Sequence, residues 1–126
     1  MTTKNRMINP AGLRTPPGPW SSAIEIRPGA RYVFTCGLVG VRQDGTYEQG
    51  VEAQAARIFE NLKILLAEAN MDMGDVVKII SYMVDVREQP LYAKGRKPYL
   101  GDAHPAMTLL GVDRKSTRLN SSHGYI

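Results

Sequence analysis

Apolar residues recur at helical spacing over residues 51–69, which form the clearest periodic stretch of the chain. They lie along one side of the predicted helix, at Val51, Ala55, Ile58, Leu62, Leu65, Leu66 and Ala69. Charged residues take most of the other positions, so the apolar side must pack against another element. Asn70 is expected to end the helix, because asparagine tolerates the left-handed backbone found at helix C-termini.

Strand patterns occur on both sides of this helix. Residues 22–26 alternate weakly, and residues 31–36 are rich in β-branched and aromatic side chains. Asp44-Gly45 is a strong hairpin signal. After the helix, residues 75–85 have the composition of a central strand, and residues 106–112 predict another short strand.

A second helix is predicted over residues 90–97. Pro90 suits a first turn, whereas Pro98 should end or kink the helix. The order strands, helix, strand, helix, strand predicts an α+β domain in which a mixed sheet carries both helices on one face. Residues 1–19 are polar and proline-rich, which predicts an extended lead-in before this domain.

Composition limits the class of protein. The 126 residues suffice for one domain, and a hydrophobic content of 43% with 22% charged residues is ordinary for a globular fold. No apolar run reaches the length of a membrane span, and the single cysteine, Cys36, excludes an intrachain disulfide framework. We therefore expect a soluble cytoplasmic protein; the acid-free, basic lead-in leaves a mitochondrial location open.

The net charge of +4 does not by itself indicate a nucleic-acid partner. The basic residues are scattered rather than clustered into a run, which is typical of an ordinary solvated surface. We expect neither a nucleic-acid nor a membrane partner.

Several short motifs occur in a characteristic order. They are Gly18-Pro19-Trp20-Ser21, Thr35-Cys36-Gly37, Asp44-Gly45, Asp75-Val76-Val77-Lys78 and His104-Pro105-Ala106. With the helix from Val51, they make residues 8–112 resemble the RidA/YjgF family of reactive-intermediate deaminases. The resemblance implies a chorismate-mutase-like α+β fold, a homotrimer with pockets between subunits, and hydrolysis of enamines or imines to a carbonyl compound and ammonia. It implies no metal and no cofactor.

By the same resemblance, the substrate pocket is expected to be lined by Trp20, Cys36, Gly37, Ala106 and Met107. No catalytic residue can be assigned. Active family members carry an arginine after the Pro-Ala pair, where it clamps the substrate carboxylate, but this chain has Met107. Methionine cannot pair with a carboxylate. It is therefore either a flexible pocket or core filler, or the mark of a pocket for an uncharged or more apolar ligand.

Cys36, Trp20 and His104 also have two interpretations each. Cys36 stands where the family often has a serine, either as a small buried hydrophobe or as a nucleophile that would need a base. Trp20 replaces a tyrosine, as a flat pocket wall or as a simple packing aromatic. Ala93 stands where the second helix often has an asparagine. His104 is more often a loop residue than an acid or base.

Three functions remain open. The first is hydrolysis of imine or enamine metabolites by a non-standard pocket without a cofactor. The second is a catalytically silent, trimeric ligand-binding or interaction protein. The third, a weaker option, is an RNA-directed member of the family.

Residues 113–126 do not continue the family pattern. The family adds a last strand rich in valine, isoleucine and glutamate, and that glutamate helps position the attacking water. Here the segment has one aliphatic residue, Leu119, before Ile126, and it resembles a translated sequencing adapter. We expect that the last strand is missing and that the sheet exposes an edge, so that trimers form poorly and the chain aggregates. A native tail without fixed structure is the alternative.

Overall fold

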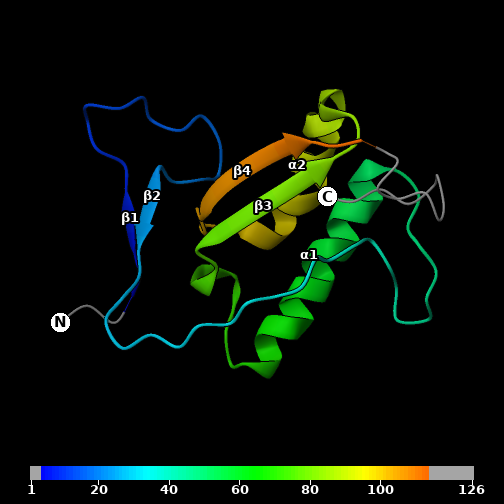
Figure 1. Ribbon diagram of the computed structural model, residues 1–126, viewed down its shortest axis with the longest axis horizontal. Helices are drawn as coiled ribbons and strands as arrows, with labels where there is room; N and C mark the ends of the chain where they lie inside the picture. Colours follow the sequence, from blue (N-terminus) through cyan, green and yellow to red (C-terminus); the bar gives the residue numbers. More distant parts are fainter. Residues whose placement is uncertain (1–3, 114–126) are drawn as a thin grey trace.

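A computed structural model describes residues 4–113 (Figure 1). Its helices are α1 (Val51–Glu68) and α2 (Gln89–Leu100), and its strands are β1 (Arg6–Ile8), β2 (Ala23–Glu25), β3 (Lys78–Met83) and β4 (Ala106–Gly111). Short 3-10 turns, η1 (Met73–Asp75) and η2 (Val86–Glu88), precede β3 and α2. The predicted α+β class is confirmed. The expectations for residues 114–126 concern a segment outside the described range.

The strands form two small sheets in the described range rather than one mixed sheet. β1 and β2 are antiparallel, with Met7 opposite Ile24, so the predicted lead-in contributes a strand. β3 and β4 are parallel over six residue pairs, from Lys78 opposite Ala106 to Met83 opposite Gly111. Parallel neighbours require a crossover connection, and α2 supplies it.

Both helices cover the same face of the β3–β4 pair, as predicted (Figure 1). The alternate strand residues that point toward the helices include Ile79, Met83, Met107 and Leu109. They meet a buried cluster formed by Ala55, Ile58, Phe59, Tyr92 and Leu100. The Phe59 ring lies 6.4 Å from the Tyr92 ring and 6.3 Å from the Tyr99 ring, measured between centroids. This aromatic contact joins α1 to α2.

The first helix agrees with its periodicity. It spans Val51–Glu68, and Asn70 has a φ of 58°, as its expected role at the helix end requires. The second helix continues to Leu100, so Pro98 does not end it, and of the two predicted effects of Pro98 the ending of the helix is wrong. Pro98 lies in the last turn of α2 and has no backbone N–H to donate to the preceding turn. The free energy lost with that hydrogen bond is smaller than the free energy gained by burying Leu100. Gly101, with a φ of 52°, follows the helix.

The predicted strand over residues 31–36 is absent from the described structure. Residues 32–37 form no backbone–backbone hydrogen bond within residues 4–113. β-branched and aromatic side chains make strand pairing favourable, but no strand within residues 4–113 forms backbone hydrogen bonds with this segment. The segment therefore runs beside the sheet without a strand partner (the cyan trace in Figure 1).

The predicted hairpin turn is confirmed. Gly45 has a φ of 90°, and the Arg42 N–H donates to the Thr46 carbonyl at 2.8 Å. Val41 and Tyr47 form a bridge on either side of the turn. Neither described helix is long and apolar enough to cross a membrane.

Candidate functional site

Two of the motifs that carry the family resemblance meet in space. The Ser21 N–H donates to the Pro105 carbonyl at 3.2 Å, and the Ser21 hydroxyl donates to the His104 carbonyl at 2.6 Å. Ser21 is buried, and a hydrogen bond is electrostatically stronger in the protein interior than in water. The two bonds therefore fix the segment after Trp20 against the start of β4. Residues 18–21 and 104–106, far apart in sequence, thus form one junction.

Trp20 folds back over Gly18 in this junction. Its ring lies so close that a Cβ atom added at Gly18 would be 2.1 Å from it. A larger residue at position 18 would have to displace the tryptophan ring, which is itself half-buried. The motif order Gly-Pro-Trp-Ser has a local structural reason in this chain.

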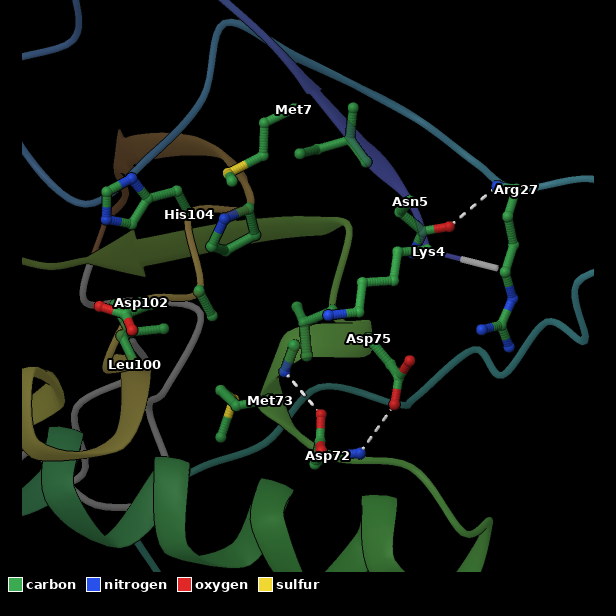
Figure 2. A pocket seen from close by; sticks show the side chains of 15 residues that line it. Lys4, Asn5, Met7, Arg27, Asp72, Met73, Asp75, Leu100, Asp102 and His104 are labelled. Carbon is green, nitrogen blue, oxygen red and sulfur yellow. Dashed lines mark hydrogen bonds between the residues drawn. The ribbon is translucent and has the colours of Figure 1, made fainter. Parts of the chain in front are cut away.

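A polar pocket of about 780 Å³ opens beside the junction (Figure 2). Its walls come from β1, β2, η1 and the loop before β4, and its polar side chains are Lys4, Asn5, Arg27, Asp72, Asp75, Asp102 and His104. Figure 2 shows His104 and Asp102 on one side of the pocket and Lys4, Arg27 and Asp75 on the other. Side chains of positive and of negative charge therefore line the same pocket.

Part of this polar wall has a structural role. The Asp72 carboxylate accepts from the Gly74 N–H, and the Asp75 carboxylate accepts from the Asp72 N–H, both at 2.9 Å. This reciprocal capping box begins η1. The Asn5 side-chain oxygen accepts from the Arg27 N–H at 2.9 Å and joins the N-terminal segment to the chain after β2.

A second cavity, the apolar groove, has a volume of about 700 Å³. One wall is residues 30–38, the opposite wall is β3, and the floor is the α1 side chains Ile58, Phe59, Leu62 and Leu66. The Ser81 and Tyr92 hydroxyls, both lining the groove, form a 2.5 Å hydrogen bond within it. The groove adjoins the polar pocket, because Asn5, Arg27 and Asp75 line both.

The five predicted pocket residues fall into two groups. Cys36 and Gly37 line the apolar groove, which borders the edge of β3 opposite β4. Ala106 and Met107 begin β4 and lie opposite Lys78 and Ile79, and Trp20 lies at the junction beside them. Neither cavity is lined by Trp20, Ala106 or Met107. That all five bind one substrate stays a prediction.

Two of the alternative interpretations can now be compared with the structure. Cys36 is exposed, so its interpretation as a buried hydrophobe is wrong for the described chain. Among residues 4–113, the segment that carries it has no strand partner to cover it. Met107 is half-buried and packs against the hydrophobic core, which agrees with its interpretation as a filler. Ala93 is half-buried within α2.

Three residues that organise this region, Ser21, Ser81 and Tyr92, were not among the predicted site residues. Ser81 is the one polar residue that β3 points toward the helices, and its position inside an apolar stretch could have marked it. Nothing in the local sequence indicates that Tyr92, eleven residues further on, is its partner. The Asn5–Arg27 contact likewise has no sequence signal.

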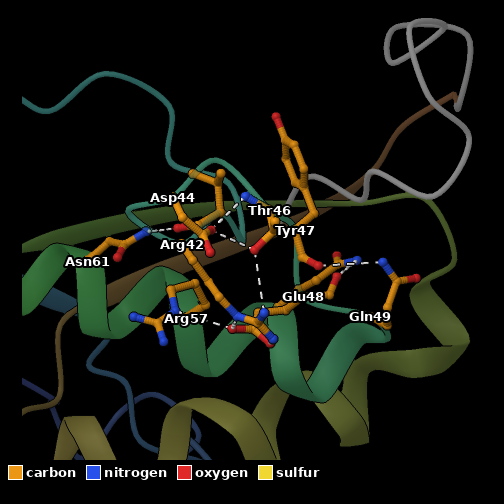
Figure 3. Close-up of polar contacts among 10 residues, drawn as sticks. Arg42, Asp44, Thr46, Tyr47, Glu48, Gln49, Arg57 and Asn61 are labelled. Atoms are coloured by element: carbon orange, nitrogen blue, oxygen red, sulfur yellow. Dashed lines mark hydrogen bonds and ion pairs between the residues drawn. The ribbon is translucent and has the colours of Figure 1, made fainter.

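A polar cluster at the hairpin lies away from both cavities (Figure 3). The Arg42 guanidinium donates to both Glu48 carboxylate oxygens at 2.7 Å, and Arg57 donates to one of them at 3.4 Å. The hydrogen bonds from Arg42 are the main cause that lowers the pKa of Glu48, and they raise the pKa of Arg42. With its oxygens held in this way, Glu48 is a structural group rather than a proton-transfer group.

Within residues 4–113, no group of three or more histidine, cysteine, aspartate or glutamate side chains could hold a metal ion. The chemistry offered by the described cavities is instead that of hydrogen bonding, apolar contact and proton transfer. Fold and site together define an α+β protein with a cleft of a size that suits a small organic ligand.

Comparison with known proteins identifies the family. The model of the family described as Endoribonuclease L-PSP matches residues 13–120, so the match ends inside the segment 113–126. A RutC family protein of Pyrococcus abyssi is 30% identical over 101 residues, which cover 79% of this chain and 77% of the relative. The chain therefore belongs to the RidA/YjgF family.

Two further similarities extend this comparison. The crystal structure of a Yersinia pestis protein of unknown function from the Rid family has a TM-score of 0.75 and 29% identity, and the alignment covers 87% of this chain and 86% of that one. A 2-iminobutanoate/2-iminopropanoate deaminase of Dermatophagoides farinae is 25% identical over 109 residues, which cover 85% of this chain and 83% of the relative.

Proposed function

We propose that this protein hydrolyses enamine or imine metabolites to a carbonyl compound and ammonia, in a pocket without a carboxylate-binding arginine. The observation that carries the proposal is the alignment of 85% of the chain with a relative named as a 2-imino acid deaminase. The junction at Ser21 supports it, since it unites two of the motifs that characterise the family.

The chemistry makes modest demands on the protein. A water molecule adds to the carbon of the C=N bond while the nitrogen accepts a proton. The C–N bond of the resulting carbinolamine then breaks, so that ammonia leaves and the carbonyl forms. Positioning and proton transfer suffice for these steps. In the polar pocket, the His104 and Asp102 side chains are of types that can donate or accept a proton.

The substrate class is inferred from the family position after the Pro-Ala pair, where this chain has Met107, although Met107 lines neither described cavity. An imino acid carries a carboxylate, which calls for a cation, and methionine supplies none. We therefore infer that the preferred imines are uncharged or more apolar than 2-aminoacrylate. By family resemblance we also propose a homotrimer with the substrate held between subunits. The cytoplasmic location stays a prediction.

Ammonia release from freshly generated imines tests the proposal. The panel contains 2-aminoacrylate and bulkier or uncharged imines, with an arginine-bearing family member as positive control. Hydrolysis above the spontaneous rate is expected, with preference for the uncharged imines. Absence of acceleration with every substrate, from protein shown to be folded and trimeric, would contradict the deaminase function.

A Met107→Arg variant tests the role of the missing arginine. A bidentate arginine–carboxylate contact is worth about 1.5–3 kcal/mol, so kcat/KM for 2-aminoacrylate should rise at least about tenfold relative to an uncharged imine. Met107→Leu is the matched control, because it keeps the volume and adds no charge. Circular dichroism must first establish that the arginine variant folds, since Met107 packs against the core.

An equal gain for charged and uncharged imines, or the same gain from leucine, would refute this assignment. The missing arginine favours one alternative, a catalytically silent ligand-binding protein. Saturable binding of an imine without turnover, from a folded trimer, is the result expected for that alternative. An RNA complex that weakens steeply with salt would favour the RNA-directed function.

A further inference from the structure

The polar pocket carries opposite charges on opposite sides. Figure 2 shows Asp102 and His104 on one side, and Lys4 and Arg27 on the other, where Asp75 also lies. The Asp75 carboxylate already accepts a hydrogen bond within η1, so the second side has two cations against one engaged acid. A ligand with a cation at one end and an anion at the other is complementary to this arrangement.

Asp102 is the carboxylate of the pocket that is available to a cationic group. The Asp72 and Asp75 carboxylates accept backbone N–H groups in the capping box of η1. Asp102, in contrast, is exposed, and its carboxylate takes part in no hydrogen bond or ion pair within residues 4–113. A primary ammonium group would give it charge-assisted hydrogen bonds.

Lys4 is the cation placed to receive the anionic end of such a ligand. Figure 2 shows its side chain extending toward the middle of the pocket, whereas Arg27 lies beyond it on the same side. Lys4 comes just before β1 and is exposed, so a carboxylate can approach its ammonium group without displacing the fold. The two charged ends of the ligand are therefore assigned to Asp102 and Lys4.

The wall between the charged sides is apolar. Its side chains come from both strands of the N-terminal sheet, from η1 and the residue after it, and from the end of α2, and they are Met7, Ile24, Met73, Val76 and Leu100. Apolar groups of a ligand would be removed from water against them. The part of the ligand that joins its two charges should therefore carry apolar side chains.

The volume of the pocket restricts the distance between the two charges. A rounded space of 780 Å³ is about 11 Å across. The ammonium and carboxylate groups of a free α-amino acid share one carbon atom, so they cannot reach both sides. The termini of an extended dipeptide are about 7 Å apart, and a hydrogen bond of about 3 Å at each end brings the span to about 13 Å. This span fits, because the lining atoms stand just outside the empty space.

We infer that the polar pocket binds a dipeptide with free termini and apolar side chains, its ammonium group at Asp102 and its carboxylate at Lys4. This binding goes beyond the proposed deaminase function and is independent of it, because a dipeptide contains no C=N bond and no imine is needed to measure its binding.

The probe is leucyl-leucine, titrated into the full chain. Trp20 is the only tryptophan of the sequence, and the neighbouring Ser21 is hydrogen-bonded to the His104 and Pro105 carbonyls of the pocket wall. Its fluorescence should therefore change as the pocket fills. A saturable change with a dissociation constant below about 1 mM is expected, and calorimetry measures the same constant without the tryptophan.

Three matched ligands separate the contributions to binding. N-acetyl-leucyl-leucine lacks the ammonium group and leucyl-leucinamide lacks the carboxylate, and each should bind at least about threefold more weakly, as expected for one exposed ion pair. Leucine keeps both charges but loses the length and one apolar side chain. It should bind at least about tenfold more weakly than leucyl-leucine.

Protein variants test the orientation of the dipeptide. Asp102→Asn should weaken leucyl-leucine at least about threefold and leave N-acetyl-leucyl-leucine unaffected, since that ligand has no ammonium group to lose. Lys4→Gln should weaken leucyl-leucine to a similar extent and leave leucyl-leucinamide unaffected. Both residues are exposed, so neither substitution disturbs the core. Glu68→Gln and Lys63→Gln make the same charge changes on exposed positions outside the pocket and are the controls.

Three results would overturn the inference. The first is the absence of saturable binding of leucyl-leucine up to about 10 mM. The second is equal binding of leucine and leucyl-leucine, which would show that the ligand does not bridge the pocket. The third is an equal effect of Asp102→Asn, or of Lys4→Gln, on all of the ligands or an equal effect of the control variants. Each of these results leaves the ammonia-release assay of the deaminase function to be decided by itself.

Discussion

Glu48 illustrates how one side chain secures a loop. Its carboxylate receives two hydrogen bonds from Arg42, while its backbone carbonyl accepts from the Gln54 side chain at 3.3 Å. The Asn61 side chain donates to the Val41 carbonyl at 2.8 Å, so the hairpin is attached to α1 at more than one point (Figure 3). The charged form of Glu48 is therefore the form that the fold requires.

This dependence predicts an effect of acid on stability. Because the pKa of Glu48 is lowered from its ordinary value of 4.5, its contribution is complete above that value and is lost as the pH falls through the lowered pKa. Glu48→Gln should reduce the free energy of unfolding at neutral pH and make its decline below pH 4.5 shallower. Urea denaturation from pH 7 to pH 3 measures both effects.

Asp44 and Asp85 also have lowered pKa values and remain in the variant, so part of the acid dependence should persist. Identical pH profiles for Glu48→Gln and the unmodified chain would contradict the role given to Glu48.

Among the elements, the contact between α1 and α2 depends on a close approach at Gly95. A Cβ atom there would lie 2.3 Å from the Glu52 carbonyl oxygen and 2.9 Å from the Ala55 Cβ. The carbonyl belongs to the backbone of α1 and cannot move aside independently. The glycine, which weakens α2 by itself, is what allows the two helices to pack.

Gly95→Ala should therefore destabilise the protein although alanine is the better helix former. The gain in helix propensity is at most about 1 kcal/mol, whereas forcing a methyl group into a packed contact typically costs about 1–3 kcal/mol. Chemical denaturation measures the difference in the free energy of unfolding. Gly12→Ala is the control, because nothing lies within 4 Å of the added atom. A more stable Gly95→Ala variant would refute the close packing.

At the scale of the whole molecule, the β3–β4 face that meets the helices is covered, but the groove beside β3 is not. Apolar residues on both of its walls lie next to a strand edge without a partner in the described chain. Such an edge favours pairing between molecules. We therefore expect the aggregation predicted from the sequence to occur at this edge of β3.

Phe34→Ser should lower concentration-dependent association without lowering the melting temperature. The Phe34 ring is 91% exposed, so its removal takes away contacts between molecules and almost none within the fold. Light scattering over a concentration series and thermal unfolding measure the two quantities. Leu13→Ser is the matched control, since Leu13 is 58% exposed but does not line the groove. Equal effects of the two substitutions would show that association is not localised at the groove.

The sequence by itself determined the elements whose signals are local. The apolar period of residues 51–69 predicted α1, Asn70 was placed correctly at its end, and Asp44-Gly45 predicted the hairpin. The order of the short motifs was sufficient to indicate the family. These features depend on neighbouring residues, so a pattern in the chain carries them.

The tertiary structure alone decided which elements pair and which side chains reach a cavity. Residues 31–36 have a strand composition, yet no described neighbour pairs with them, and Cys36 is exposed for that reason. Met107 packs against the core, which agrees with its interpretation as a filler, and its place in a substrate pocket stays a prediction, while Ser81 and Tyr92 meet inside the groove. Pairing and burial depend on residues distant in sequence, and the local pattern does not specify where those residues will lie.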